Sequence, residues 1–246
     1  MRIGIYLNQN SMAGGGFYES LNRASNLSDS GLKIITFTSN KSMLRELNDA
    51  RIDTVYFAIS HIDRLLLFLR RQILLIASKM VPGNIYPVKI IKKILPKYNR
   101  FEKEFIKNGV DIIYFPSPES NAIYIEYLNF IFAVWDLAHN EIPFFPEIRH
   151  NFAHNTREYL YRNVLPLACA ITVGHEVAKQ QIILKYGQSQ EKLFILPFLP
   201  SGKIVEFDNF YKHDLNMNAN GFDQEPYLYY PAQYSPHKNH RIIIDF

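Results

Sequence analysis

Three short segments of the sequence hold residues of the types that bind and activate substrates. The first contains Gly14, Gly15 and Gly16, which stand just before a predicted helix. Glycines let a backbone approach a ligand closely, and a helix N-terminus attracts an anion such as phosphate. The run lacks the following Lys-Ser/Thr pair of a P-loop, so a plain turn is an equally good interpretation.

The second segment runs from Trp135 to Glu141 and contains Asp136 and His139. A polar cluster of this kind at a strand end suits hydroxyl recognition and proton transfer. An aspartate that caps a helix among surface polar residues is the alternative interpretation. Because Asp136 and His139 are three residues apart in an expected tight turn, we predict that both face a cleft and that His139 is an exposed loop residue.

The third segment, residues 235–240, places Lys238 at the start of a predicted helix. A lysine in that position is a good phosphate contact, although a solvated first turn is an equal alternative. The three segments agree on one expectation, which is an anionic, hydroxylated ligand bound between two sheet domains.

The elements that must position these segments alternate between strand and helix, which predicts an α/β fold with a Rossmann-like parallel sheet flanked by helices. Ligands of such open sheets bind beyond the carboxyl ends of the strands, where these segments lie. Strands are expected at 2–7, 33–38, 54–58, 110–115, 130–134, 170–173 and 193–196, and helices at 17–27, 41–49, 62–80, 101–107, 147–165 and 175–186.

The composition changes near residue 200, which predicts a domain boundary. Residues 1–203 form the predicted first domain, and the polar, Asn- and Asp-rich stretch 204–226 is a predicted linker. Residues 227–246 read as a strand at 227–231 followed by the start of a helix. About twenty residues cannot bury a core of their own, so we interpret them as the first β-α unit of an incomplete second domain.

Charge and cysteine content exclude some classes of protein. The 27 basic and 23 acidic residues give a net charge of +4, and the basic residues match no nucleic-acid-binding motif, so we expect no nucleic acid partner. The single cysteine, Cys169, excludes an intramolecular disulfide, reads as buried and favours a reducing, cytoplasmic location. His150 and His154 lack further ligands at a suitable spacing, so no metal site is expected.

Residues 62–95 combine apolar and basic side chains, with Arg64, Arg70 and Arg71 among leucines and isoleucines. No stretch is long and uncharged enough to span a bilayer, which takes about 20 residues. One interpretation is a core helix with snorkelling basic ends. The other is peripheral contact with the anionic inner face of a membrane, where each basic residue contributes about 1 kcal/mol.

Four stretches carry a more specific pattern: Gly14 to Tyr18; Val134 to His139 with Phe145 to Glu147; Ile171 to Glu176; and Tyr229 to His240. Together they resemble the retaining glycosyltransferases of family 4, most specifically in the last stretch and only weakly between Asp49 and Val110. The family has the GT-B fold, in which two Rossmann-like domains face each other. The resemblance implies that this chain is the N-terminal, acceptor-side domain of such a fold.

The resemblance implies a function and a role for each site residue. The enzyme would transfer a sugar from a nucleotide-sugar donor to a glycan or lipid-linked acceptor in cell-surface polysaccharide synthesis, with no cofactor besides the donor itself. Gly14, Gly15 and Gly16 would bind the donor diphosphate together with Lys238. Asp136 and His139 would be the catalytic residues on the acceptor side.

Two departures from the family bear on these roles. Trp135 stands where many members have a histidine, and His139 would take over its contact. The glutamate pair that holds the donor in the family is not reached by residue 246, so we expect the 246-residue chain to be inactive alone. The alternatives are a non-catalytic truncated remnant, or a binding module that needs a separately encoded second domain.

Overall fold

The computed structural model describes residues 1–9, 14–80, 99–198 and 228–245, except for the side chains of residues 77–80 and 151. The predicted linker 204–226 and the stretch 88–95 lie outside these ranges. None of the helices within them is long and apolar enough to cross a membrane.

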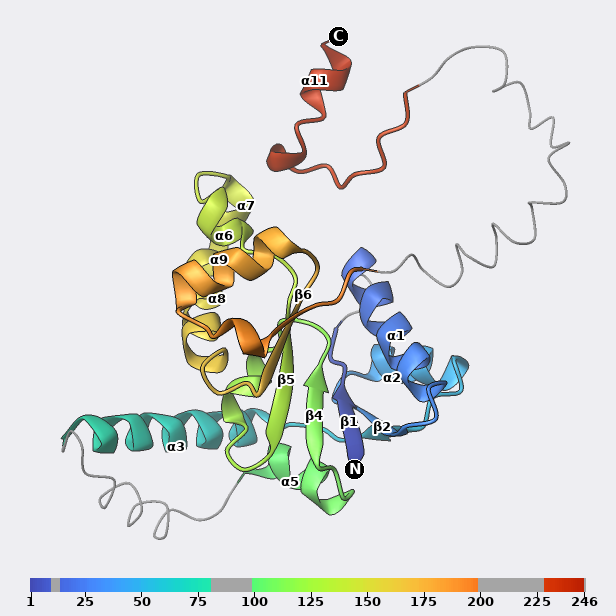
Figure 1. Cartoon of the computed structure of the whole chain (residues 1–246), viewed down its shortest axis with the longest axis vertical. Helices are drawn as coiled ribbons and strands as arrows, with labels where there is room; N and C mark the ends of the chain where they lie inside the picture. The colour runs from blue at the N-terminus through green and yellow to red at the C-terminus, as the bar shows by residue number, and fades with distance from the viewer. Residues whose placement is uncertain (10–13, 81–98, 199–227, 246) are drawn as a thin grey trace, which may run out of the picture.

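A seven-stranded sheet forms the centre of the molecule (Figure 1), and every neighbouring pair of strands is parallel. The strand order is β3-β2-β1-β4-β5-β6-β7, which confirms the predicted Rossmann-like α/β fold. The order reverses between β1 and β4. The strands are β1 (Arg2–Tyr6), β2 (Lys33–Thr38), β3 (Thr54–Tyr56), β4 (Ile112–Phe115), β5 (Asn129–Val134), β6 (Ala170–Val173) and β7 (Leu193–Ile195).

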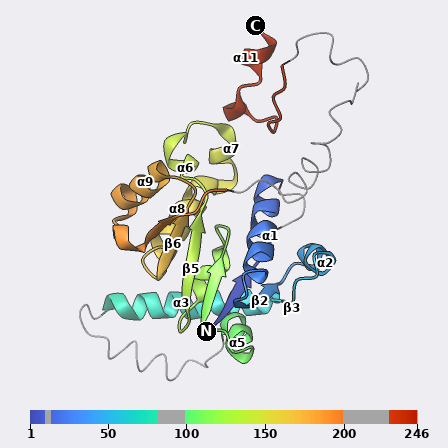
Figure 2. The ribbon, with the colours of Figure 1, turned by 45° about the vertical axis from the view of Figure 1, so that its right-hand side comes forward.

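Helices cover both faces of this sheet because successive strand residues point to opposite sides. Ile5 and Leu7 pack in one core with α1 (Gly15–Ser28) and α2 (Lys41–Asp49). Tyr6 belongs to the other, aromatic-rich core, which includes residues of α5 (Arg100–Lys107) and α8 (Ala153–Val164). Figure 2 shows α1 and α2 on one side of the strands and α8 on the other.

The remaining elements connect these layers. The long α3 (His61–Met80) follows β3, and a 3-10 turn, η2 (Ser120–Tyr124), precedes β5. After β5 come α6 (Ala138–Glu141) and α7 (Pro146–Arg149), and α9 (Glu176–Tyr186) follows β6. A 3-10 turn, η4 (Gln190–Lys192), leads into β7.

The predicted helix 147–165 is wrong as a single element. It divides into α7, a 3-10 turn η3 (His150–Phe152) and α8. Phe152 has a φ of 57°, in the left-handed region, and this conformation interrupts the ladder of helical hydrogen bonds before α8 begins. Helical spacing of apolar residues does not reveal such a break, because it depends on one backbone angle.

Residues 228–231 form no strand, contrary to the prediction, since no neighbouring strand is placed to pair with them in the described part of the chain. The segment 228–245 instead has a 3-10 turn, η6 (Pro236–Lys238), and the four-residue helix α11 (Arg241–Ile244). It stands above α7 in Figures 1 and 2. Cys169 is exposed rather than buried, because it lies in the turn that enters β6.

Candidate functional site

A groove of about 470 Å³ opens at the carboxyl edge of the sheet. Its walls come from the start of α1 and from the chain that follows β5, so it spans the point where the strand order reverses. Open parallel sheets bind ligands at this place. The groove brings together the first two predicted segments, and its lining residues are Gly15, Gly16, Glu19, Trp135, Asp136 and Phe198.

The three glycines have three different surroundings. Gly14 has a φ of 67°, so a residue with a side chain would be strained there. A Cβ on Gly15 would meet none of the described residues within 4 Å, whereas a Cβ on Gly16 would overlap the ring of Trp135. No side chain of the described residues caps the first turn of α1, so the backbone N–H groups of that turn could bind an anion in the groove.

Trp135 is held in place from two sides. Its Nε1 donates a hydrogen bond to the carbonyl of Pro116 at 2.9 Å, directly after β4. Its ring meets the ring of Phe198 edge-on, with 6.4 Å between centroids. The indole therefore forms a fixed apolar wall of the groove, as expected for a surface that packs against the face of a sugar or a base.

Asp136 lies beside this wall with its side chain half exposed. Its Oδ1 accepts hydrogen bonds from the backbone N–H of Ala138, at 3.0 Å, and from Nη1 of Arg157, at 2.8 Å. Because the ion pair with Arg157 is solvent-exposed, it adds little stability. Its effect is to fix the direction of the carboxylate at the groove.

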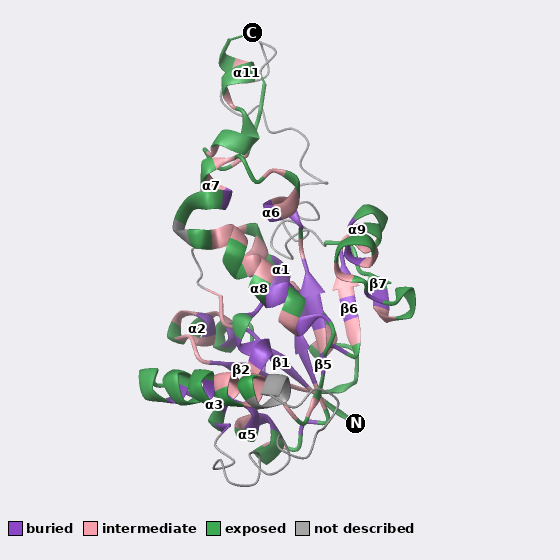
Figure 3. Cartoon of the chain, turned by 90° about the vertical axis from the view of Figure 1, so that its left-hand side faces the viewer, coloured by how far each residue is buried: buried purple, intermediate pink, exposed green. Residues whose placement is uncertain are grey.

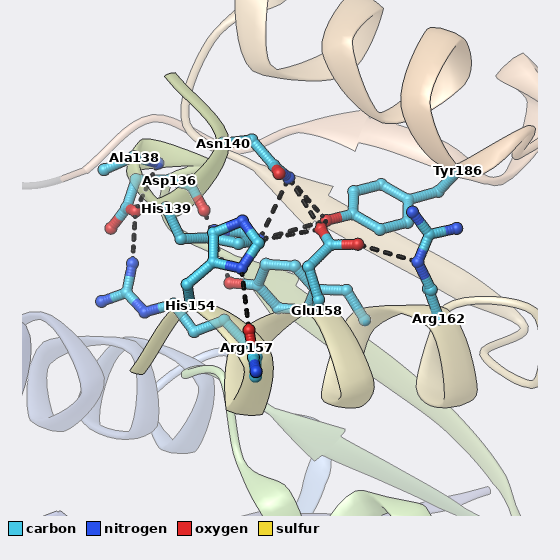
Figure 4. A network of polar contacts seen from close by, with 11 residues as sticks. Asp136, Ala138, His139, Asn140, His154, Arg157, Glu158, Arg162 and Tyr186 are labelled. Carbon is cyan, nitrogen blue, oxygen red and sulfur yellow. Dashed lines mark hydrogen bonds and ion pairs between the residues drawn. The ribbon is translucent and has the colours of Figure 1, made fainter. Parts of the chain in front are cut away.

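His139 is fully buried, so the prediction of an exposed loop residue is wrong. The residue lies on the short helix α6, and its ring points away from solvent into the space between α8 and α9 (Figure 4). Its Nε2 lies 3.1 Å from Oε1 of Glu158 and 3.2 Å from the hydroxyl of Tyr186. The groove does not include His139 among its lining residues, and its catalytic role stays a prediction.

The protonation of this cluster follows from its surroundings. Partial burial alone would raise the pKa of Glu158, but hydrogen bonds from Tyr186, Asn140, His139 and Arg162 lower it to about 2. Burial lowers the pKa of His139, more than the neighbouring Glu158 raises it. At neutral pH a neutral His139 therefore donates from Nε2 to an ionised Glu158. The Nδ1 atom is buried and has no hydrogen-bond partner among the described residues.

The same cluster reaches the groove through α8. Asn140 donates to Glu158 and to the hydroxyl of Tyr186, which itself donates to Glu158 at 2.5 Å. One residue before Glu158 on α8, Arg157 holds Asp136. The buried contacts of α6 thus fix the turn that carries Asp136, while Asp136 itself faces the groove.

The chain just before the third predicted segment approaches the glycine turn. Nε2 of Gln233, two residues before the segment, lies 3.7 Å from the position that a Cβ on Gly14 would take. The segment is held by Glu147, whose Oε1 accepts hydrogen bonds from the backbone N–H of His237, at 3.0 Å, and from its Nδ1, at 2.5 Å. Lys238 lies on η6 and does not line the groove, so its contact with a phosphate stays a prediction.

Sequence reasoning missed three residues that shape the groove, which are Glu19, Arg23 and Phe198. Arg23 is buried, bonds to Glu19 at 2.6 Å, and donates to the carbonyls of Leu196 and Pro197. These bonds hold the chain after β7 across the start of α1 and place Phe198 against Trp135. The four-residue spacing of Glu19 and Arg23 behind the glycines was the available signal.

No metal site accompanies these residues in the described part of the chain, where no three His, Cys, Asp or Glu side chains are grouped to hold an ion.

No family model matches the sequence, and no curated protein is significantly similar to it. Several solved structures resemble the chain at low sequence identity. A glycosyltransferase from Rickettsia africae ESF-5 is 12% identical, with 88% of this chain and 50% of that chain covered and a TM-score of 0.45. Anabaena Alr3699/HepE in complex with UDP is 11% identical, with 86% and 50% covered and a TM-score of 0.46. MurG from Acinetobacter baumannii is 14% identical, with 81% and 68% covered and a TM-score of 0.22. The chain spans about half the length of the first two.

Proposed function

We propose that this chain is the acceptor-side half of a retaining glycosyltransferase of family 4, which transfers a sugar from a nucleotide-sugar donor to a glycan or lipid-linked acceptor. One observation carries the proposal. The groove at the strand-order reversal places an uncapped glycine turn on one wall and a fixed, half-exposed carboxylate on the other. The first suits a diphosphate and the second a hydroxyl, which are the two groups that this reaction brings together.

On the donor side, the N–H groups at the start of α1 would bind the diphosphate of the nucleotide sugar. Gly15 leaves the room for it, since no atom of the described residues lies within 4 Å of its Cβ position. As the bond between the anomeric carbon and the phosphate oxygen breaks, negative charge develops on the diphosphate. Fixed N–H groups stabilise that charge without rearranging during the reaction. Lys238 would add a positive charge from the C-terminal segment.

On the acceptor side, Asp136 would accept a hydrogen bond from the attacking hydroxyl and orient it. The oxygen of that hydroxyl bonds to the anomeric carbon on the face from which the diphosphate leaves, which retains the configuration. The hydroxyl proton passes to the departing phosphate oxygen. His139 would act as a positioning residue, because it is buried behind the turn that carries Asp136.

The organisation of the chain and its biological setting are part of the same proposal. Residues 1–203 would form the acceptor-side domain, 204–226 a linker and 227–246 the start of the donor-binding domain. The product would be a cell-surface polysaccharide built from the cytoplasmic side, at the inner face of the membrane.

The only tryptophan of the chain, Trp135, gives a direct test. Its ring is a wall of the groove, so its fluorescence should change in a saturable way when uridine- or guanosine-diphosphate sugars are titrated into the protein. We expect Gly15→Ala to weaken the response at least about tenfold by filling the space for the diphosphate. The proposal fails if no nucleotide sugar changes the emission of protein that circular dichroism shows to be folded.

A second arm addresses the carboxylate. Asp136→Asn should keep the fluorescence response of Trp135 to nucleotide sugars but weaken the binding of acceptor sugars. The reason is that an amide oxygen accepts a hydrogen bond from a hydroxyl less strongly than a carboxylate does. Asp245→Asn is the matched control, because Asp245 is also an exposed aspartate paired with an arginine, Arg241, at 2.8 Å. Equal effects of the two substitutions would remove Asp136 from the proposed site.

A further inference from the structure

The outward face of α3 is apolar, which is the reverse of an ordinary surface helix. Figure 3 shows most of this helix exposed. Six aliphatic side chains between 41% and 69% exposed recur three or four residues apart and so share one side of the helix. We call them the α3 stripe, and they are Ile62, Leu65, Leu66, Leu69, Ile73 and Ile76.

The inward face of α3 holds the charges instead. Arg70 is buried and makes two hydrogen bonds of 2.8 Å with the carboxylate of Glu126. Arg71 donates to the carbonyl of Ile123 at 2.9 Å and to Asn163 at 2.7 Å. Leu67 is the one buried apolar side chain among residues 61–76. These polar contacts fix the rotation of the helix and keep the α3 stripe turned outward.

The described side chains of α3 and α5 carry an excess of positive charge. Residues 61–76 and 99–107 contain six basic and three acidic residues, a net charge of +3. Arg64, Arg100, Lys103 and Lys107 of this region have exposed side chains.

The neighbouring helix α5 continues the same surface. A groove joins it to α3 and is lined by Arg70, Lys103, Ile106 and Tyr127, among others. Ile106 is half exposed and Tyr127 is 60% exposed. Exposed apolar side chains thus lie beside Lys103 next to α3, a combination found on surfaces that lie at a lipid interface.

We propose that the α3 stripe docks on the surface of an anionic phospholipid bilayer. The aliphatic side chains would insert among the head groups while α3 lies in the plane of the membrane, and the flanking arginines and lysines would contact lipid phosphates. Charge favours this occupant over a second copy of the chain. A dimer through this face would bring two positively charged copies of α3 and α5 together, whereas anionic lipid neutralises them. The inference does not depend on sugar transfer, because no residue that lines the candidate-site groove at the carboxyl edge of the sheet takes part.

Vesicle flotation with the full chain tests the proposal without any donor or acceptor. We expect the protein to float with vesicles in which about a third of the lipid is phosphatidylglycerol, and to float far less with phosphatidylcholine alone or at high salt. The double variant Leu69→Glu, Ile73→Glu should stay at the bottom of the gradient. The matched control is Leu184→Glu, at an 82% exposed leucine on α9, which should float like the wild type.

A pair of charge variants tests the role of the basic residues. Arg64→Glu should lower the apparent affinity for anionic vesicles at least about fivefold. Arg45→Glu makes the same change at an exposed position on α2 and should have little effect. Flotation of the double variant like the wild type would overturn the proposal. The proposal is also overturned if the wild type floats with neither vesicle type. If the wild type then sediments as a dimer and the double variant as a monomer, the α3 stripe is a contact between two copies of the chain.

Discussion

The indole ring of Trp135 lies directly over Gly16, so closely that a methyl group on Gly16 would overlap it. This contact joins the end of β5 to the start of α1 across the point where the strand order reverses. The glycine at this position is therefore required by a neighbouring side chain, while its neighbour Gly15 faces open space.

Gly16→Ala should destabilise the fold, because the new methyl group forces Trp135 to shift. We expect a loss of about 1–3 kcal/mol in the free energy of unfolding, measured by urea denaturation. The emission of Trp135 should change in the folded state as well, since its hydrogen bond to Pro116 would be strained.

Gly15→Ala is the matched control for that experiment. The new methyl group meets none of the described residues within 4 Å and replaces a glycine in the first turn of a helix, so stability should be unchanged or slightly higher. Equal losses in both variants would contradict the distinction drawn between the two glycines.

His139→Ala should lower stability as well as any activity. The ring is fully buried, and its removal leaves a cavity and takes one hydrogen-bond partner from Glu158 and Tyr186. We expect a loss of about 2–3 kcal/mol in the free energy of unfolding. His150→Ala, at an exposed histidine, should change it by less than about 0.5 kcal/mol. If the His139→Ala protein were as stable as the wild type and had lost only activity, the result would favour the catalytic role of His139 that the sequence predicts.

The same cluster should make the protein less stable in acid. The pKa of His139 lies below its usual 6.5, so the unfolded chain binds more protons and stability falls as the pH drops through about 6.5. The pKa of Glu158 falls from 4.5 to about 2, so a second loss follows as the pH drops from 4.5 toward 2.

Glu158→Gln separates the two effects. This substitution removes the carboxylate, so the difference in stability between wild type and variant should shrink as the pH is lowered below 4.5. Urea denaturation at several pH values measures it. A difference that stays constant across that range would show that Glu158 has an ordinary pKa in the folded protein.

Glu147 is the contact that ties the C-terminal segment to α7. Glu147→Gln should loosen it, because the amide is a weaker acceptor for the two N–H groups of His237. Trypsin should then cleave after Lys238 and Arg241 severalfold faster, as followed by mass spectrometry. Glu176→Gln, on an exposed glutamate of α9, is the control and should leave these rates unchanged.

The sheet was predictable from the sequence because its signal is local. Short apolar runs such as 33–38 and 130–134 alternate along the chain with segments whose apolar residues recur at helical spacing. A continuous apolar run is the only pattern that a parallel strand buried on both faces requires. Six of the predicted strands overlap β1 to β6 and the seventh overlaps β7. The break at Phe152 was not predictable, because it depends on one backbone angle and leaves the apolar periodicity intact.

The candidate site was predictable only in part, for the same physical reason. The position of the glycines and of Asp136 at strand ends follows from the order of the elements. The burial of His139 does not, because it depends on Glu158 and Tyr186, which arrive from helices 19 and 47 residues away in the sequence. Arg23 likewise acts on carbonyls more than 170 residues away.

The hold of Arg23 on the carbonyls of Leu196 and Pro197 has a consequence for whatever follows in the chain. It pins the chain that follows β7 beside α1, so that Phe198 forms a wall of the groove. The proposed donor-binding domain would then be tethered at the rim of the binding site itself. Its effective concentration at the groove is then set by the length of the tether and not by the concentration of protein in solution.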